Sequence, residues 1–239
     1  MISDGFKERV NEISDFIEIM EFFENLENKR LEDGRSGFDE IFHHDEKNIS
    51  ITYQSLINIL KSNASLMIYN LIESTVMNSV TAIYDQINEE GLSYSQVSES
   101  IRKLWRNVQM KPLKDPNSNY TTISNQCEKI INHILESDVI NLNARNTVDG
   151  GNLDCSSIKN NFSRIGITID IDYSKGQDSI LSSIKEHRNQ LAHGQVTFID
   201  ALKQKSIGDI NIEFHSVKSF LEDMNKRVEE YIDAKKYRA

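Results

Sequence analysis

The chain has 239 residues, of which 38% are apolar and 27% are charged, a composition typical of a globular protein with one sizeable core or at most two. Its formal net charge of −10 argues against a general nucleic-acid binder, because such proteins usually carry a basic surplus. The sequence has neither a start resembling a signal peptide nor an apolar run of about 18 residues, so we expect a cytoplasmic protein without a membrane segment.

The acidic surplus lies at the beginning of the chain. Residues 1–50 hold 14 acidic and 6 basic side chains, and the remaining residues are close to neutral. Apolar residues step along one face between Phe6 and Leu31, which predicts a helix that ends in the glycine-containing stretch 33–37. We therefore expect an acidic N-terminal helix and loop, residues 1–50, that packs on a helical domain of residues 51–239.

Two groups of metal-binding residue types occur, but neither predicts a metal site. In His43-His44-Asp45-Glu46 the neighbouring side chains project in divergent directions, and no third ligand follows at a helical spacing, so a solvated loop is the better interpretation. Cys127 and Cys155 are too few and too far apart for a disulfide framework or a zinc knuckle.

The rest of the chain is predicted to be mostly helical, because it has only two prolines and few glycines. A loop is expected over 141–151, and Thr168–Asp172 alternates like a short strand without a partner. Asp170 and Asp172 are assigned to this surface connection. The predicted helices span 56–89, 94–110, 121–136, 154–162 with an end near Gly166, 179–193 and 214–236.

One residue of the predicted helix 56–89 invites a functional interpretation. Glu73 stands among apolar neighbours, so its carboxylate needs a partner. In one interpretation Glu73 forms an ordinary salt bridge or lies on an exposed face. In the other, Glu73 orients Arg188 or His193 from a neighbouring helix.

The next helix carries the densest basic and aromatic patch of the chain: Arg102, Lys103, Arg106 and Trp105. Such a patch can hold an RNA backbone and stack a base. The alternative is a solvated basic face with a tryptophan in the core.

The most informative stretch is residues 186–194, which put an arginine, an amide and a histidine on about one and a half turns of predicted helix. Arg188 can clamp a phosphate, and His193 can move protons near neutral pH as general base or acid. Asn189 is a positioning amide. These groups suffice for RNA cleavage, because the 2′-hydroxyl is the nucleophile and no metal or other cofactor is required. His187 lies near the apolar stripe and is the weaker candidate, a core or interface histidine in the alternative interpretation.

Residues 183–194 with Thr197-Phe198 strongly resemble the signature segment of the HEPN superfamily, whose active members share an Arg-x4-6-His motif. Residues 66–75 and 151–154 are similar to two further blocks of its MAE-type HEPN-like nuclease branch, and the resemblance runs from about Ser50 to the C-terminus. It implies an all-α HEPN-like helical bundle that forms a homodimer. It also implies a toxin or phage-defence ribonuclease, acting on RNA and controlled by a cognate antitoxin or another defence-system protein.

One departure concerns control of the activity. Some HEPN toxins carry a tyrosine two positions after the motif histidine, where a partner nucleotidyltransferase modifies them. This chain has Gln195 at that position, which argues against control by such a modification.

Helix geometry gives a physical reason to expect the dimer. Arg188 and His193 are five positions apart and point about 140° away from each other, whereas Asn189 and His193 lie one turn apart. Two such helices paired across a twofold axis would bring two arginines and two histidines into one cleft.

The alternative function is a non-catalytic HEPN-type module that binds RNA, a nucleotide or a partner protein. The presence of both Arg188 and His193 favours the enzyme.

Overall fold

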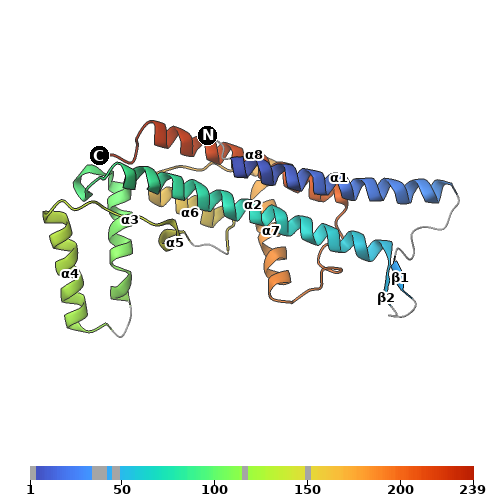
Figure 1. Ribbon diagram of the computed structural model, residues 1–239, viewed down its shortest axis with the longest axis horizontal. Coiled ribbons are helices and arrows are strands. Elements are labelled where there is room, and N and C mark those ends of the chain that lie inside the picture. Colours follow the sequence, from blue (N-terminus) through green and yellow to red (C-terminus); the bar gives the residue numbers. More distant parts are fainter. Residues whose placement is uncertain (1–3, 34–41, 45–48, 115–117, 149–151) are drawn as a thin grey trace. The chain divides into compact units, whose positions relative to one another are not determined.

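The computed structural model describes residues 4–33, 42–44, 49–114, 118–148 and 152–239 (Figure 1). The predicted all-α class is confirmed, with one antiparallel pair of three-residue strands in addition. Helices and strands follow in the order α1 (Asp4–Glu32), β1 (Phe42–His44), β2 (Ile49–Ile51), α2 (Tyr53–Glu89), α3 (Glu99–Gln109), α4 (Tyr120–Leu135), α5 (Ala144–Thr147), α6 (Cys155–Ile165), α7 (Gln177–Ala192) and α8 (Ile207–Asp233).

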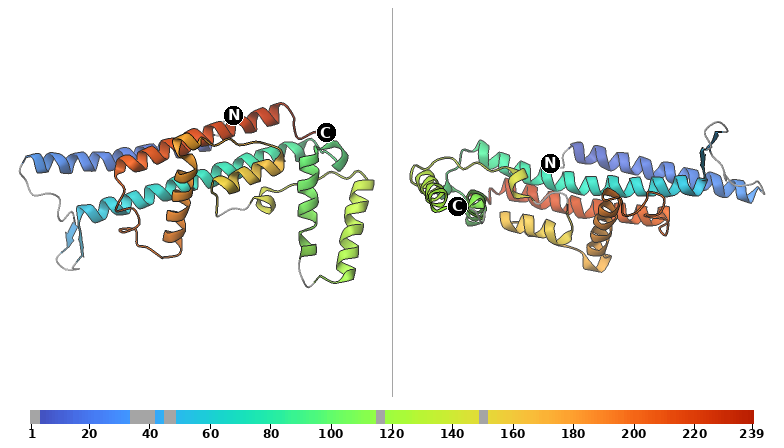
Figure 2. Two further views of the ribbon diagram at one scale, coloured as in Figure 1. Left: turned by 180° about the vertical axis from the view of Figure 1, so that it is seen from behind. Right: turned by 90° about the horizontal axis from the view of Figure 1, so that it is seen from below.

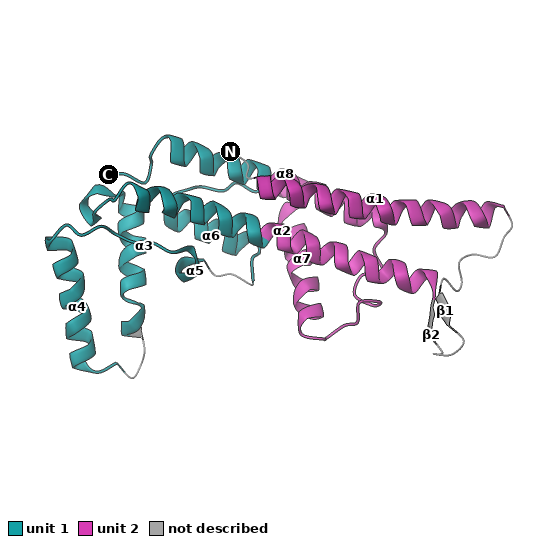
Figure 3. Cartoon of the chain, viewed as in Figure 1, with its two compact units in different colours: residues 1, 73–171, 222–239 teal, residues 2–72, 172–221 magenta. Residues whose placement is uncertain are grey.

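The chain divides into two compact units, which are coloured separately in Figure 3. Unit 1 comprises residues 73–171 and 222–239, and unit 2 comprises the residues up to 72 together with residues 172–221. Helices α2 and α8 contribute to both units. The signature residues of α7 therefore belong to unit 2, and the basic patch of α3 belongs to unit 1. The predicted division at residue 50 stays a prediction.

In unit 1, α3 and α4 run side by side (Figures 1 and 2). Trp105 of α3 joins them, because its ring stacks on His133 of α4 at 4.9 Å between centroids. Helix α6 begins with a capping box at Asp154 and ends at Gly166, which adopts the left-handed conformation, as the sequence predicts.

In unit 2, α1 buries one apolar face, and its Glu21 accepts a hydrogen bond of 3.3 Å from Asn211 of α8. Helix α7 runs across the first half of α2 rather than along it (Figures 1 and 2). The loop after α7 is held by two buried donors of α2. The Lys61 ammonium donates to the Lys205 carbonyl, and the Ser62 hydroxyl donates to the Phe198 carbonyl, both at 2.7 Å.

Three local predictions differ from the structure. The predicted loop 141–151 contains the single helical turn α5, capped by the side chain of Asn143. Helix α8 begins at Ile207 instead of residue 214, because Ser206 and Asp209 form a reciprocal capping box. Residues 168–172 form no strand, although burial alternates along 167–171 as the pattern predicts. The prediction of a solvated loop at residues 43–46 stays a prediction, because the side chains of these residues lie outside the described part of the chain.

None of the helices that the structure describes combines the length and the apolar character needed to cross a membrane.

Candidate functional site

The signature residues lie at the C-terminal end of α7, where a Schellman motif stops the helix. Gly194 adopts a left-handed conformation with φ of 64°. Its amide donates to the Leu191 carbonyl at 3.1 Å, and the Gln195 amide donates to the Gln190 carbonyl at 2.9 Å. His193 is the C-cap residue, and its side chain is exposed. The end of the helix thus holds the imidazole at the surface.

We expect Gly194→Ala to lower the free energy of unfolding by about 1 kcal/mol, because only the backbone strain of a left-handed alanine acts there. A Cβ on Gly194 would meet no heavy atom within 4 Å. The matched control is Gly208→Ala in the first turn of α8, where φ is not positive and the nearest side-chain atom would lie at 3.6 Å. Urea denaturation should show a lower free energy of unfolding for Gly194→Ala and no decrease for Gly208→Ala. Equal stability of the two variants would contradict the role of Gly194 in the Schellman motif.

Arg188 is half-buried and is held from two sides. Its guanidinium carbon lies 4.9 Å from the centre of the Tyr69 ring, a cation–π distance. Its Nη1 donates a hydrogen bond of 3.0 Å to Oδ1 of Asn189. Tyr69 belongs to α2 and is completely buried. The structure thus brings residues 66–75 and residues 183–194 together, two of the segments that resemble the HEPN family. Within the second segment, Asn189 positions Arg188.

His187 lies one residue before Arg188, and its surroundings keep the imidazole neutral. Burial, followed by the charge of Lys205, lowers the pKa of His187 to about 4 against the opposing effect of Glu186. Its Nδ1 is buried and has no hydrogen-bond partner among the described residues. This favours the interpretation of His187 as a core or interface histidine.

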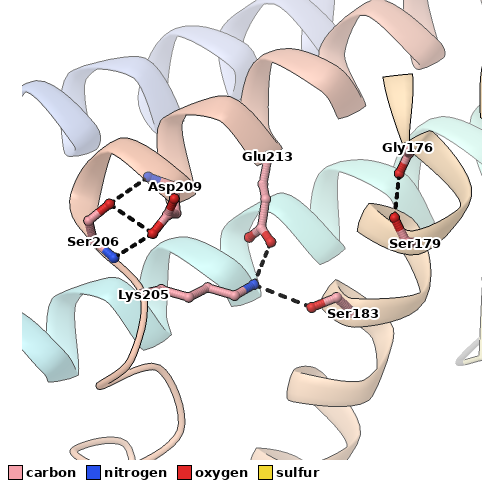
Figure 4. A network of polar contacts seen from close by, with 7 residues as sticks. All are labelled: Gly176, Ser179, Ser183, Lys205, Ser206, Asp209 and Glu213. Atoms are coloured by element: carbon pink, nitrogen blue, oxygen red, sulfur yellow. Dashed lines mark hydrogen bonds and ion pairs between the residues drawn. The ribbon is translucent and has the colours of Figure 1, made fainter. Parts of the chain in front are cut away.

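A polar network behind α7 was not predicted from the sequence (Figure 4). The Lys205 ammonium donates to the Glu213 carboxylate of α8 and, at 3.3 Å, to the Ser183 hydroxyl of α7. Both charged side chains are largely buried. Burial raises the pKa of Glu213, and the hydrogen bond from Lys205 opposes this rise. The network therefore ties α7 to the beginning of α8.

The predicted RNA-binding patch is divided by the structure. Trp105 is 2% exposed and also packs edge-on against Tyr94, so the prediction that its ring stacks a base is wrong and the core alternative holds. Arg106 lies 3.1 Å from the Glu99 carboxylate, and Arg102 donates to the Val97 carbonyl at 2.9 Å.

Lys103 is the remaining cation of the patch, and it is exposed on a different side of α3, where it lines a groove against α6. Glu73 is half-buried and belongs to unit 1, whereas Arg188 and His193 belong to unit 2. The idea that Glu73 orients them stays a prediction.

A mainly helical chain with an arginine, an amide and a histidine at the end of one helix has the features of a HEPN domain. The family model described as HEPN_MAE_28990-like HEPN matches residues 1–237, and the chain belongs to this family. The match extends the resemblance from about residue 50 back to residue 1, so the family includes the acidic N-terminal segment. No match was found among curated proteins or among solved structures.

Proposed function

We propose that this protein is a HEPN-type endoribonuclease that needs no metal, with Arg188, Asn189 and His193 as its active-site residues. One observation carries the proposal. The exposed His193 imidazole stands one helical turn after Asn189, the residue that holds the Arg188 guanidinium. A proton-transfer group and a fixed cation thus come from one short segment, as cleavage of a phosphodiester requires.

The chemistry follows from the groups present. A neutral imidazole removes the proton of the 2′-hydroxyl, whose oxygen attacks the adjacent phosphorus. The bond to the 5′-oxygen breaks, and that oxygen leaves with a proton from a second, protonated imidazole. Arg188 stabilises the charge on the phosphorane, and the products are a 2′,3′-cyclic phosphate and a free 5′-hydroxyl.

The reaction uses two imidazoles, and each copy of α7 supplies one at its exposed end. We therefore propose a homodimer that shares one cleft between two α7 ends. The biological setting that fits such an enzyme is a toxin or a phage-defence effector, with a cognate antitoxin or defence-system protein that restrains it. Uncontrolled RNA cleavage in the cell would otherwise be harmful.

A non-catalytic HEPN module is the second candidate. The net charge of −10 favours it, because an acidic chain attracts an RNA substrate poorly, whereas binding of a partner protein does not depend on such attraction. Such a module would bind an RNA, a nucleotide or a partner protein and would have no need of an exposed His193.

The two candidates are separated by incubating the full chain with mixed RNAs in excess EDTA. The nuclease cleaves and leaves cyclic phosphate ends, and Arg188→Ala abolishes cleavage with an unchanged circular dichroism spectrum. Lys185→Ala is the matched control on the same helix, three residues earlier, and should cleave as the wild type does. Absence of cleavage by the wild type over a broad set of RNAs supports the binding module.

The shared cleft predicts that two inactive variants complement each other. When Arg188→Ala and His193→Ala chains are mixed, unfolded and refolded together, the mixed dimers contain one complete pair of residues. We expect partial cleavage, above that of either variant refolded alone and below that of the wild type, because the mixed cleft keeps one imidazole and one guanidinium and water must replace the second imidazole; the same labelled RNA in EDTA measures it. A mixture as inactive as its components, together with a monomer in sedimentation at micromolar concentration, would contradict the shared site.

A further inference from the structure

A groove between α3 and α6 in unit 1 stands apart from the signature residues and has a volume of about 320 Å³. Two cations, two amides and two hydroxyls line it, with one leucine, and no carboxylate is among its described lining residues. The lining residues are Ser100, Lys103, Leu104 and Asn107 from α3, and Asn160, Ser163 and Arg164 from α6.

The polar lining is built into two facing helix surfaces. On each helix the lining residues recur at three or four positions, so they share one face. Gly166 at the end of α6 permits the close approach, since a Cβ there would come within 3.2 Å of the Ser100 hydroxyl. Arg164 is fixed by a hydrogen bond of 3.2 Å from its Nη1 to the Thr147 carbonyl.

The absence of acid from this groove is unusual in a chain with 37 acidic residues. The acidic residue of α3 is Glu99, and its carboxylate is paired with Arg106 and Arg102. Lys103 lies between those two arginines in the sequence, and its side chain lines the groove. The groove is therefore a local positive site on an acidic protein.

A second depression of about 320 Å³ continues the first, because both include Asn160 and Ser163. It adds Lys159 and the apolar side chains of Ile167 and Ile169. The combined site thus offers cations beside amides, followed by a partly apolar wall. A ligand that fits it has an anionic group, hydrogen-bonding groups and a less polar part.

We propose that this groove binds the phosphate of a nucleotide, either free or within an RNA strand. Lys103 and Arg164 hold the phosphate oxygens, since such charge-assisted hydrogen bonds are the strong ones. Asn107 and Asn160 meet the hydroxyl groups of the sugar. No aromatic ring lines the described groove, so recognition is by phosphate and sugar and is insensitive to sequence.

The test is a binding measurement that does not depend on cleavage. The full chain carries His193→Ala and is kept in EDTA, so RNA persists whether or not the wild type is a nuclease. The probes are a fluorescein-labelled single-stranded RNA of 12 nucleotides and adenosine 5′-monophosphate. We expect Lys103→Gln and Asn160→Asp each to weaken binding about tenfold, an ordinary effect for one charged hydrogen bond. Both side chains are exposed, so both variants should fold.

Arg106→Gln is the matched control, because it removes a cation of α3 outside the groove and should leave binding unchanged. If adenosine 5′-monophosphate displaces the RNA, the ligand is a free nucleotide; if only unlabelled RNA displaces it, the ligand is an RNA strand. Unchanged affinity of both groove variants would overturn the proposal. So would an Arg106→Gln effect as large as that of Lys103→Gln, since the exposed basic patch would then be the binding surface.

Discussion

Replacing His193 with alanine should lower the rate of RNA cleavage by about two to four orders of magnitude, the usual contribution of a positioned general acid or base. The change should leave the fold intact, because the side chain is exposed and its backbone contacts, through the amide to the carbonyls of Asn189 and Leu191, do not need the imidazole. Initial rates on a labelled RNA in EDTA measure the activity, and urea denaturation checks stability.

His215→Ala is the matched control for this experiment. His215 is exposed on α8 and belongs to the same unit, so the variant removes one imidazole of similar accessibility away from the signature segment. It should retain the wild-type rate. Because the site of His193 is open to solvent, free imidazole in the buffer should restore part of the lost rate in His193→Ala and none in Arg188→Ala. A rate above one tenth of the wild type in His193→Ala would remove this residue from the active site.

Local signals in the sequence mark the ends of the helices, including one end that the periodicity of apolar residues does not predict. Asp154 and Gly166 mark both ends of α6, because an acidic N-cap and a left-handed glycine are local devices. The start of α8 has an equally local signal in Ser206 and Asp209. The prediction that begins this helix at Phe214 rests on composition, which Gly208 interrupts, and not on this capping signal.

For the site, the sequence supplies the chemical groups of α7 but not what holds them. Tyr69 lies more than 100 positions before Arg188, so its ring could be placed beneath the guanidinium only by the fold. Periodicity also leaves open which side of a helix is buried. The patch on α3 therefore combined a core tryptophan, two arginines paired with Glu99 and the groove residue Lys103 in one surface.

The second large effect concerns the stability of α7. We expect Lys205→Met to lower the free energy of unfolding at neutral pH by about 3 kcal/mol, because it leaves the Glu213 carboxylate buried without its cation. Lys205 joins Glu213 of α8 to Ser183 of α7, so the loss should also loosen the signature helix. Lys203→Met is the control: its exposed pair with Asp200, at 3.5 Å, should be worth less than about 1 kcal/mol.

The pH dependence identifies the unpaired carboxylate as the cause. Burial already raises the pKa of Glu213, and removal of Lys205 removes the effect that opposes the rise. A carboxyl whose folded pKa exceeds its unfolded pKa destabilises the protein above the folded pKa, and this penalty disappears as the pH falls toward the unfolded value of about 4.3. The difference in the free energy of unfolding between the wild type and Lys205→Met should therefore shrink as the pH is lowered from 7 to 5. The double variant Lys205→Met/Glu213→Leu should recover most of the lost stability at pH 7, because no buried charge remains. A deficit that is independent of pH and persists in the double variant would show that Lys205 acts through its packing and not through the carboxylate.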